Sequence, residues 1–222
     1  MVKIYLVRHC QTEGNLARYF QGSIDTPVSE NGKIQLDLLS VRFRNIKYDY
    51  IYTSPLGRAV ATAEAVNRFH DNEIIPVDDF REIHAGKIEK VSWSDIPILF
   101  PEQAKNWNEK AYDFAPPDGE KMTEVYDRMS SAFERVLKIA KDGETIVIVS
   151  HGAALRTLNC YLKFHDIKRL NDMDIGVNTA VSLWKYENGN FEAEYLNDGS
   201  HLPDWTPGKN LRANFFLTEN KG

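Results

Sequence analysis

Two short segments that lie far apart in the chain carry the side chains best suited to chemistry. The first, residues 7–15, places Arg8 and His9 directly after the apolar run 4–7. The second, residues 150–156, places His151 directly after another apolar run. Each segment is followed by a helix-like stretch. We therefore expect both histidines at the carboxyl ends of buried strands, where open α/β sheets form their ligand crevices.

This set of side chains suits the transfer of a phosphoryl group. A neutral imidazole such as His9 is a competent nucleophile toward phosphorus, and a phosphohistidine divides one difficult displacement into two easier ones. Because the transferred group carries charge on its equatorial oxygens, fixed positive donors must surround it. Arg8, Arg58 and a protonated His151 can supply that charge. The backbone N–H groups at the start of the next helix, from Gly152 onward, can add to it.

Two further candidates follow the other predicted strands. Arg58 falls in the first turn of a predicted helix, where the macrodipole disfavours a cation, and such a locally unfavourable residue often serves function. Glu82 follows the strand predicted at 74–77 and is our choice for the group that protonates the leaving alkoxide and later activates water. The residues alone do not separate Glu82 from Asp78 or Asp79 in this role.

Taken in order, these motifs resemble the histidine phosphatase superfamily, the group of phosphoglycerate mutases and related phosphatases. The resemblance extends from Val2 to about Arg156 and rests on four motifs: the Arg-His loop, Ser-Pro-x-x-Arg-Ala-x-x-Thr-Ala, the Arg-Glu pair and the late Ser-His-Gly. It implies His9 as the phosphorylated nucleophile and Glu82 as the proton donor. It further implies no metal, and it assigns phosphate or substrate contacts to Arg8, Asn15, Gln21, Gly22, Arg58 and His151.

The chain also departs from the family pattern at three places. Cys10 stands where glycine usually follows the histidine, residues 86–90 replace a commoner Gly-x-x-Glu-Gly, and Lys121 stands where serine is usual. A Cβ at Cys10 restricts the loop backbone more than glycine would. We interpret Cys10 as a small packing residue that the chemistry does not need.

The sequence predicts one domain, 1–222, with strands alternating with helices. Strands are expected at 2–7, 48–53, 74–77, 145–149, 180–186 and 191–196, and helices at 31–43, 56–69, 122–140 and 152–162. The Asn-Gly pair at 188–189 predicts a hairpin. The expected fold is α/β: a three-layer α/β/α arrangement around a mostly parallel mixed sheet, similar to phosphoglycerate mutase. Residues 84–118 read as a small cap insertion, and 198–222 as an irregular tail.

The overall composition limits which classes of binding partner and cofactor we expect. A net charge of −5 argues against a large nucleic-acid surface, and no apolar run is long enough to suggest a membrane span. Cys10 and Cys160 are too few for a disulfide framework, which favours the cytoplasm. No histidine pair has zinc-site spacing, so we expect no metal cofactor. The expected partner is a small phosphomonoester, and a homodimer is possible.

Three functions remain open at this stage. We favour a metal-independent phosphomonoesterase, in which water hydrolyses the phosphohistidine. A phosphoglycerate mutase that depends on 2,3-bisphosphoglycerate is the alternative, although mutases of this family typically carry a Glu-Arg-His-Tyr-Gly type segment that the residues after Glu82 lack. The third is a binding module without catalysis. The aromatic residues of the cap, including Trp93 and Trp107, either pack the cap or form a pocket for an apolar leaving group.

Overall fold

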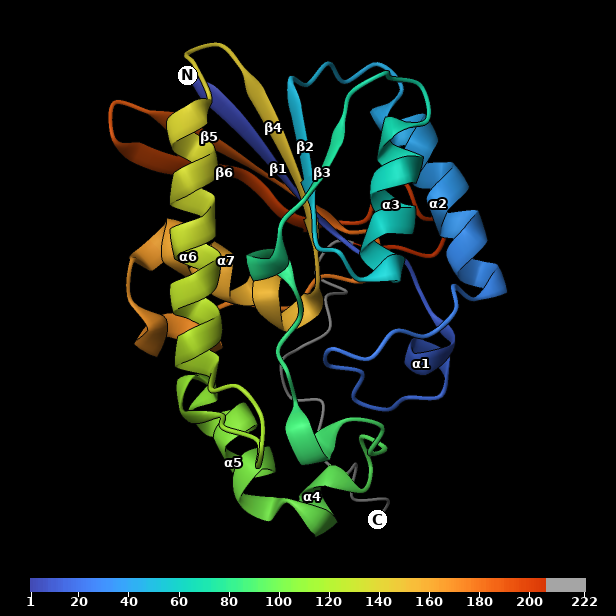
Figure 1. Ribbon diagram of the computed structural model, residues 1–222, viewed down its shortest axis with the longest axis vertical. Helices are drawn as coiled ribbons and strands as arrows, with labels where there is room; N and C mark the ends of the chain where they lie inside the picture. Colours follow the sequence, from blue (N-terminus) through green and yellow to red (C-terminus); the bar gives the residue numbers. More distant parts are fainter. Residues whose placement is uncertain (207–222) are drawn as a thin grey trace.

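The computed structural model describes residues 1–206, and within them a six-stranded mixed sheet forms the centre of the molecule (Figure 1). The strands, in the order β3-β2-β4-β1-β5-β6, are β1 (Val2–Arg8), β2 (Tyr50–Thr53), β3 (Ile74–Pro76), β4 (Thr145–Ser150), β5 (Val181–Glu187) and β6 (Asn190–Asp198). Strands β1 to β4 run parallel, whereas β5 pairs antiparallel with β1 and β6 with β5. The predicted mixed sheet and its terminal hairpin are confirmed.

The helices are α1 (Glu13–Leu16), α2 (Glu30–Phe43), α3 (Gly57–Asn67), α4 (Ile96–Leu99), α5 (Pro101–Glu109), α6 (Met122–Ile139) and α7 (Gly152–Phe164). The 3₁₀ turns are η1 (Asp78–Phe80), η2 (Gly86–Ile88), η3 (Ala111–Asp113) and η4 (Ile167–Asp172). Ser29 caps α2, with its hydroxyl accepting from Gly32 N–H. The predicted helix 56–69 is shorter at both ends, with Leu56 as its N-cap and Arg68 as its C-cap. In the part of the chain described, no helix is both long and apolar enough to cross a membrane.

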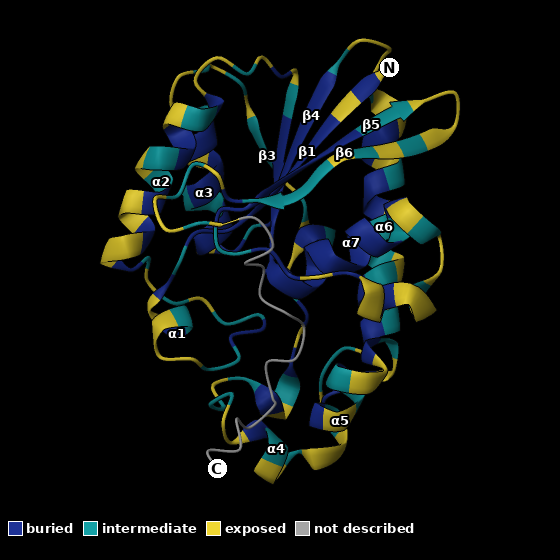
Figure 2. Cartoon of the chain, turned by 180° about the vertical axis from the view of Figure 1, so that it is seen from behind, coloured by how far each residue is buried: buried dark blue, intermediate teal, exposed yellow. Residues whose placement is uncertain are grey.

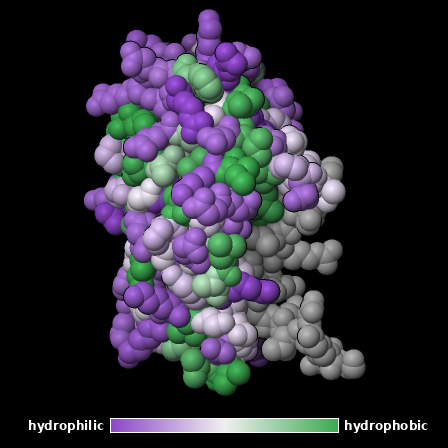
Figure 3. All heavy atoms as spheres, turned by 90° about the vertical axis from the view of Figure 1, so that its right-hand side faces the viewer, coloured by the Kyte–Doolittle hydropathy of each residue, from purple (hydrophilic) through white to green (hydrophobic). Residues whose placement is uncertain are grey.

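The two faces of the sheet are covered by different helices because side chains alternate along each strand. In β1, Ile4 and Leu6 join the core formed with α6 and α7, whereas Tyr5 and Val7 join the core formed with α2 and α3. Figure 2 shows the central strands buried along most of their length. Figure 3 shows the side on which α2 and α3 lie, where hydrophobic side chains are scattered among hydrophilic ones. The three-layer prediction is confirmed.

The segment predicted as a cap folds into short helices beyond the carboxyl ends of the strands (Figure 1). Trp107 of α5 and Phe114 lie in its interior, with ring centroids 4.9 Å apart in an edge-to-face arrangement. Ala111 N–H donates to Asn171 Oδ1 at 2.8 Å, which ties the cap to η4. The part of the predicted tail from 207 to 222 lies outside the described residues.

Candidate active site

The two histidines meet because the strands that carry them are neighbours. Arg8 at the end of β1 pairs in register with Ser150 at the end of β4, so His9 and His151 follow side by side. His9 N–H donates to the Ser150 carbonyl at 2.9 Å, which continues the ladder one residue past the strand. The ring centroids of His9 and His151 are 5.2 Å apart. The predicted meeting of the two segments is therefore observed.

The His9 ring is oriented by the backbone that follows it. Its Nδ1 lies 2.6 Å from the carbonyl oxygen of Cys10. Because a carbonyl can only accept, Nδ1 carries the proton, and Nε2 is left with a lone pair. The pKa of His9 is lowered well below 6.5, first by burial and then by the positive charges of Arg58 and Arg8. The imidazole is therefore neutral and able to act as a nucleophile near pH 7.

Two buried guanidinium groups lie at the same end of the pocket. Arg8 donates from Nη1 to the Gly176 carbonyl at 2.5 Å, and Arg58 donates to the carbonyls of Gly22 and Ile24, both at 2.7 Å. In each side chain Nε is buried without a partner in the structure. Burial lowers the pKa of Arg8 to about 10, so the group is still a cation near neutrality. Each arginine thus keeps an unused donor at Nε, while Nη1 of Arg8 and both Nη atoms of Arg58 are hydrogen-bonded.

His151 is completely buried beside His9. Its Nε2 lies 2.7 Å from Ser54 Oγ, and its Nδ1 is buried without a partner. Burial, followed by the positive charge of Arg58, lowers the pKa of His151 well below 6.5. The ring is neutral in these surroundings, whereas the sequence analysis considered it protonated. An anion placed against it would raise the pKa again, because a nearby opposite charge favours the protonated form.

Glu82 occupies the N-terminus of α7. Its two carboxylate oxygens accept from the N–H groups of Ala153 and Ala154, each at 3.0 Å, and Oε1 also accepts from Ile83 N–H. The sequence analysis assigned the first N–H groups of this helix to phosphate, and for two of them that assignment is wrong. A carboxylate is favoured at this position by the unpaired N–H groups and the helix dipole. The arrangement brings Glu82 to the edge of the same pocket.

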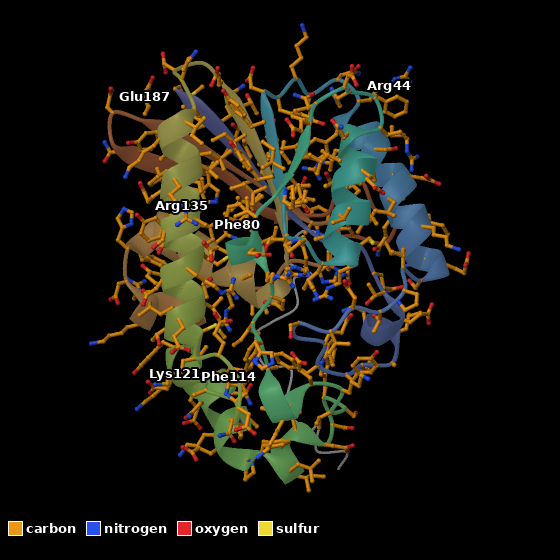
Figure 4. All side chains as sticks on the ribbon, in the orientation of Figure 1. Arg44, Phe80, Phe114, Lys121, Arg135 and Glu187 are labelled. Carbon is orange, nitrogen blue, oxygen red and sulfur yellow. The ribbon has the colours of Figure 1, made fainter. Side chains whose placement is uncertain are left out.

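Helix α6 holds the segment that leads to Glu82. Arg128 donates from Nη1 to the carbonyls of Asp79 at 2.6 Å and Arg81 at 2.8 Å, and it forms an ion pair with Glu120. Figure 4 shows α6, which carries Arg135, beside the segment that carries Phe80 and leads to Glu82. Arg128 was not among the predicted site residues, because a helical arginine gives no local sign of what it reaches across the fold.

The loop after β1 places an amide against the pocket. Asn15 Oδ1 accepts from Thr12 N–H at 3.1 Å and from Asn178 Nδ2 at 3.4 Å, so its Nδ2 is the group free to face the pocket. Asn178 Nδ2 also lies 3.0 Å from the His9 carbonyl. Gly22 has a φ of +53°, and a Cβ there would lie 2.5 Å from Glu89 Oε1, so glycine is required. Neither Asn178 nor Ser54 was predicted as a site residue.

Many of these residues line one pocket. Eight of the predicted site residues line it, and they are Arg8, His9, Asn15, Gln21, Gly22, Arg58, Glu82 and Gly152. His151, whose ring centroid lies 5.2 Å from that of His9, is not among the lining residues. The remaining lining residues are Tyr19, Phe20, Trp93, Trp107, Ala153 and Ile175. Within residues 1–206, no cluster of three or more His, Cys, Asp and Glu side chains is arranged to hold a metal ion.

The fold is that of a known class of protein. The chain belongs to the histidine phosphatase superfamily (branch 1), whose family model matches residues 4–199. It is 38% identical over 162 residues to a probable phosphoglycerate mutase GpmB of Photorhabdus laumondii, covering 71% of this chain and 73% of that one. It is 32% identical over 169 residues to phosphoserine phosphatase 1 of Hydrogenobacter thermophilus, covering 76% and 80%. Among solved structures, YhfR of Bacillus stearothermophilus is similar with a TM-score of 0.84 and 30% identity, covering 90% and 99%.

Proposed function

We propose that the protein is a metal-independent phosphomonoester hydrolase that works through a phosphohistidine on His9. One observation carries the proposal: His9, whose Nε2 is unprotonated, lines the pocket together with Arg8 and Arg58, and each of these arginines has a buried Nε without a partner. A buried polar group without a partner costs about 1–3 kcal/mol. These two donors, with the unpartnered Nδ1 of the adjacent His151, form a prearranged site for an oxyanion.

In the first half-reaction His9 Nε2 attacks phosphorus in line with the ester oxygen. An N–P bond forms, the P–O ester bond breaks, and the phosphoryl oxygens are stabilised by Arg8, Arg58 and His151. The departing alkoxide takes a proton from the carboxylic acid of Glu82 and leaves as an alcohol. Because phosphate binding adds negative charge next to His151, that ring gains a proton as the complex forms.

In the second half-reaction water replaces the alcohol. The Glu82 carboxylate accepts a proton from the water, the water oxygen attacks phosphorus, and the N–P bond breaks. Inorganic phosphate and neutral His9 result, with Glu82 protonated for the next cycle. The Cys10 carbonyl keeps the Nδ1 proton in place and stabilises the positive charge that develops on the ring when Nε2 bonds to phosphorus.

A phosphoglycerate mutase is the second candidate, and the similarity to the probable GpmB mutase favours it. That reaction uses the same pocket but returns the phosphoryl group to the substrate instead of water, with 2,3-bisphosphoglycerate to prime the histidine. Phosphoserine phosphatase 1, a relative at comparable identity, favours hydrolysis. Interconversion of 2- and 3-phosphoglycerate stimulated by 2,3-bisphosphoglycerate, with little release of phosphate, would support the mutase.

The proposal is tested by measuring inorganic phosphate release from a panel of esters in the presence of EDTA. The panel contains an aryl phosphate, a sugar phosphate, a nucleotide, phosphoserine and 3-phosphoglycerate. We expect release by the wild type and loss of at least about a thousandfold in His9→Ala, since a nucleophile has no substitute. The matched control His84→Ala removes an exposed histidine and should retain activity. Binding of phosphate without turnover of any ester would contradict the proposal and favour a binding module.

A further inference from the structure

The pocket has a second end that the chemistry above does not use. Beyond the phosphate donors it is lined by Tyr19, Phe20, Trp93, Trp107 and Ile175. We propose that this aromatic wall binds the leaving group, so that the preferred substrates are phosphate esters of neutral apolar or aromatic alcohols. The inference rests on the proposed hydrolase and names its substrate class.

The wall is built by pairing two segments that are distant in sequence. Phe20 N–H donates to the Val91 carbonyl at 2.9 Å, and Lys90 N–H donates to the Phe20 carbonyl at 2.8 Å. Trp93 N–H donates to the Arg18 carbonyl at 2.9 Å. These bonds fix the two backbone segments that carry Phe20 and Trp93 relative to each other. A surface that is prearranged in this way loses little conformational entropy when a ligand binds.

The aromatic residues divide into a structural set and a contact set. Trp107 is 2% exposed and Phe114 is fully buried, so these two rings chiefly pack the cap. Phe20 packs edge-to-face on Trp107 with centroids 5.8 Å apart, yet it is only half-buried. Tyr19 and Trp93 are half-buried as well. Since these three line the pocket, they present ring surface to whatever fills it.

The charged side chains that line the pocket itself belong to the phosphate site. Among the described residues that line the pocket, the ionisable groups of Arg8, Arg58 and Glu82 all lie around His9 or at the start of α7. Two further guanidinium groups pack on indole rings: Arg18 on Trp93 and Arg156 on Trp107, each with Cζ 5.8 Å from the ring centroid.

This distribution of charge predicts selection against anionic leaving groups. A carboxylate or second phosphate on the leaving group would lie against aromatic surface, where the described lining residues other than Arg8 and Arg58 offer no cation, which disfavours its binding. An apolar group loses water there without that penalty. The wall therefore favours a benzyl-like group over a glycerate, and hydrolysis over phosphoglycerate mutase activity.

The test compares benzyl phosphate with ethyl phosphate, because the two alcohols have similar acidity and the comparison then reports binding more than leaving-group chemistry. We expect kcat/KM for benzyl phosphate to exceed that for ethyl phosphate by about tenfold or more in the wild type. Trp93→Ala should lower this ratio by about tenfold, and Trp93→Phe should keep most of it. Phe69→Ala, which removes a 48% exposed ring next to Arg44, is the matched control and should leave the ratio unchanged.

The outcomes separate this inference from the proposed function. A wild-type ratio near one, or a ratio that Trp93→Ala leaves intact, would overturn the aromatic leaving-group site while the hydrolase stands. No release from any ester would overturn both. If Trp93→Ala does not fold, inhibition of the wild type by benzylphosphonate and ethylphosphonate gives the same comparison, and equal inhibition constants would overturn the inference.

Discussion

His9 donates its Nδ1 proton to the carbonyl oxygen of Cys10, the next residue in the chain, across 2.6 Å. The tautomer of the candidate nucleophile is thus fixed by the backbone and not by an acidic side chain. Cys10 N–H in turn donates to Thr62 Oγ1 of α3 at 2.9 Å, which anchors the peptide group on the preceding side. The direction of Nε2 therefore depends on the geometry of the loop after β1.

The side chain of Cys10 should be dispensable even though its carbonyl is not. Cys10→Ala keeps the hydrogen bond to His9, so we expect kcat/KM for an aryl phosphate to stay within about threefold of wild type. Because the thiol is buried, the free energy of unfolding should fall by about 1 kcal/mol from the small cavity. Steady-state kinetics and urea unfolding give both values. A loss of a hundredfold or more in a folded variant would show that the thiol takes part in the reaction.

Arg128 should act by positioning Glu82. It binds the carbonyls of Asp79 and Arg81, so Arg128→Met frees the segment just before Glu82 and should lower kcat by about tenfold or more. The inhibition constant for inorganic phosphate should change little, because Arg128 does not line the pocket. Arg135→Met removes a more exposed ion pair to the same Asp79 and serves as the control. Equal effects of the two substitutions on kcat would reject the positioning role.

Asn178 should orient the amide of Asn15. Asn178→Asp replaces the donor with an oxygen that faces two acceptors, the His9 carbonyl and Asn15 Oδ1. We expect inhibition by vanadate to weaken by about tenfold, because Asn15 can no longer hold Nδ2 toward the pocket. In an Asn15→Ala background the same substitution should have a much smaller effect on vanadate binding. Asn190→Asp, at the exposed first residue of β6, is the control. Additive effects of the substitutions at 15 and 178 would argue against coupling.

Stability should depend on the two buried histidines at mildly acidic pH. The pKa values of His9 and His151 are lowered in the folded protein, chiefly by burial, whereas both side chains titrate near 6.5 in the unfolded chain. As the pH falls below about 6.5, the unfolded chain gains protons that the folded chain does not. The free energy of unfolding should therefore decrease, by up to about 1.4 kcal/mol per pH unit for each histidine. Above that pH their contribution is constant.

Urea unfolding of the wild type and of His9→Asn between about pH 5 and pH 7 measures this dependence. His9→Asn should reduce the slope of the free energy of unfolding against pH by up to about 1.4 kcal/mol per pH unit, which is the contribution of one titrating histidine. His84→Asn, at an exposed position, should leave the slope as it is. An identical slope in wild type and His9→Asn would mean that His9 is protonated in the folded protein at these pH values.

The sequence predicted the parts of the site that follow directly from strand ends. Apolar runs before Arg8 and His151 located both segments, and parallel pairing of their strands is enough to bring the histidines together. Arg58 was identifiable because a cation in the first turn of a helix is locally unfavourable. Asn178 and Arg128 were missed because their partners lie 169 and 49 residues away, and no local pattern encodes such contacts.

Glu82 shows where local reasoning about helices fails. The start of α7 was expected to offer its N–H groups to phosphate. Two of them instead bind the carboxylate of Glu82, which precedes Ala153 by 71 residues and Ala154 by 72. Which anion occupies a helix N-terminus is decided by tertiary packing, and the sequence of the helix itself does not contain that information. In the cap, too, the sequence could not predict which aromatic rings are buried, because only the fold shows that Trp107 is buried and Trp93 is half-buried.

The central claim is that phosphate is transferred to His9, and the most direct test is to trap the intermediate. The enzyme is mixed with an aryl phosphate, quenched in alkali to preserve acid-labile phosphate, digested and analysed by mass spectrometry. We predict phosphate on His9, at Nε2, in the wild type and none at this position in His9→Asn. Phosphate on another residue, or turnover without any phosphoenzyme on the time scale of one catalytic cycle, would contradict the mechanism.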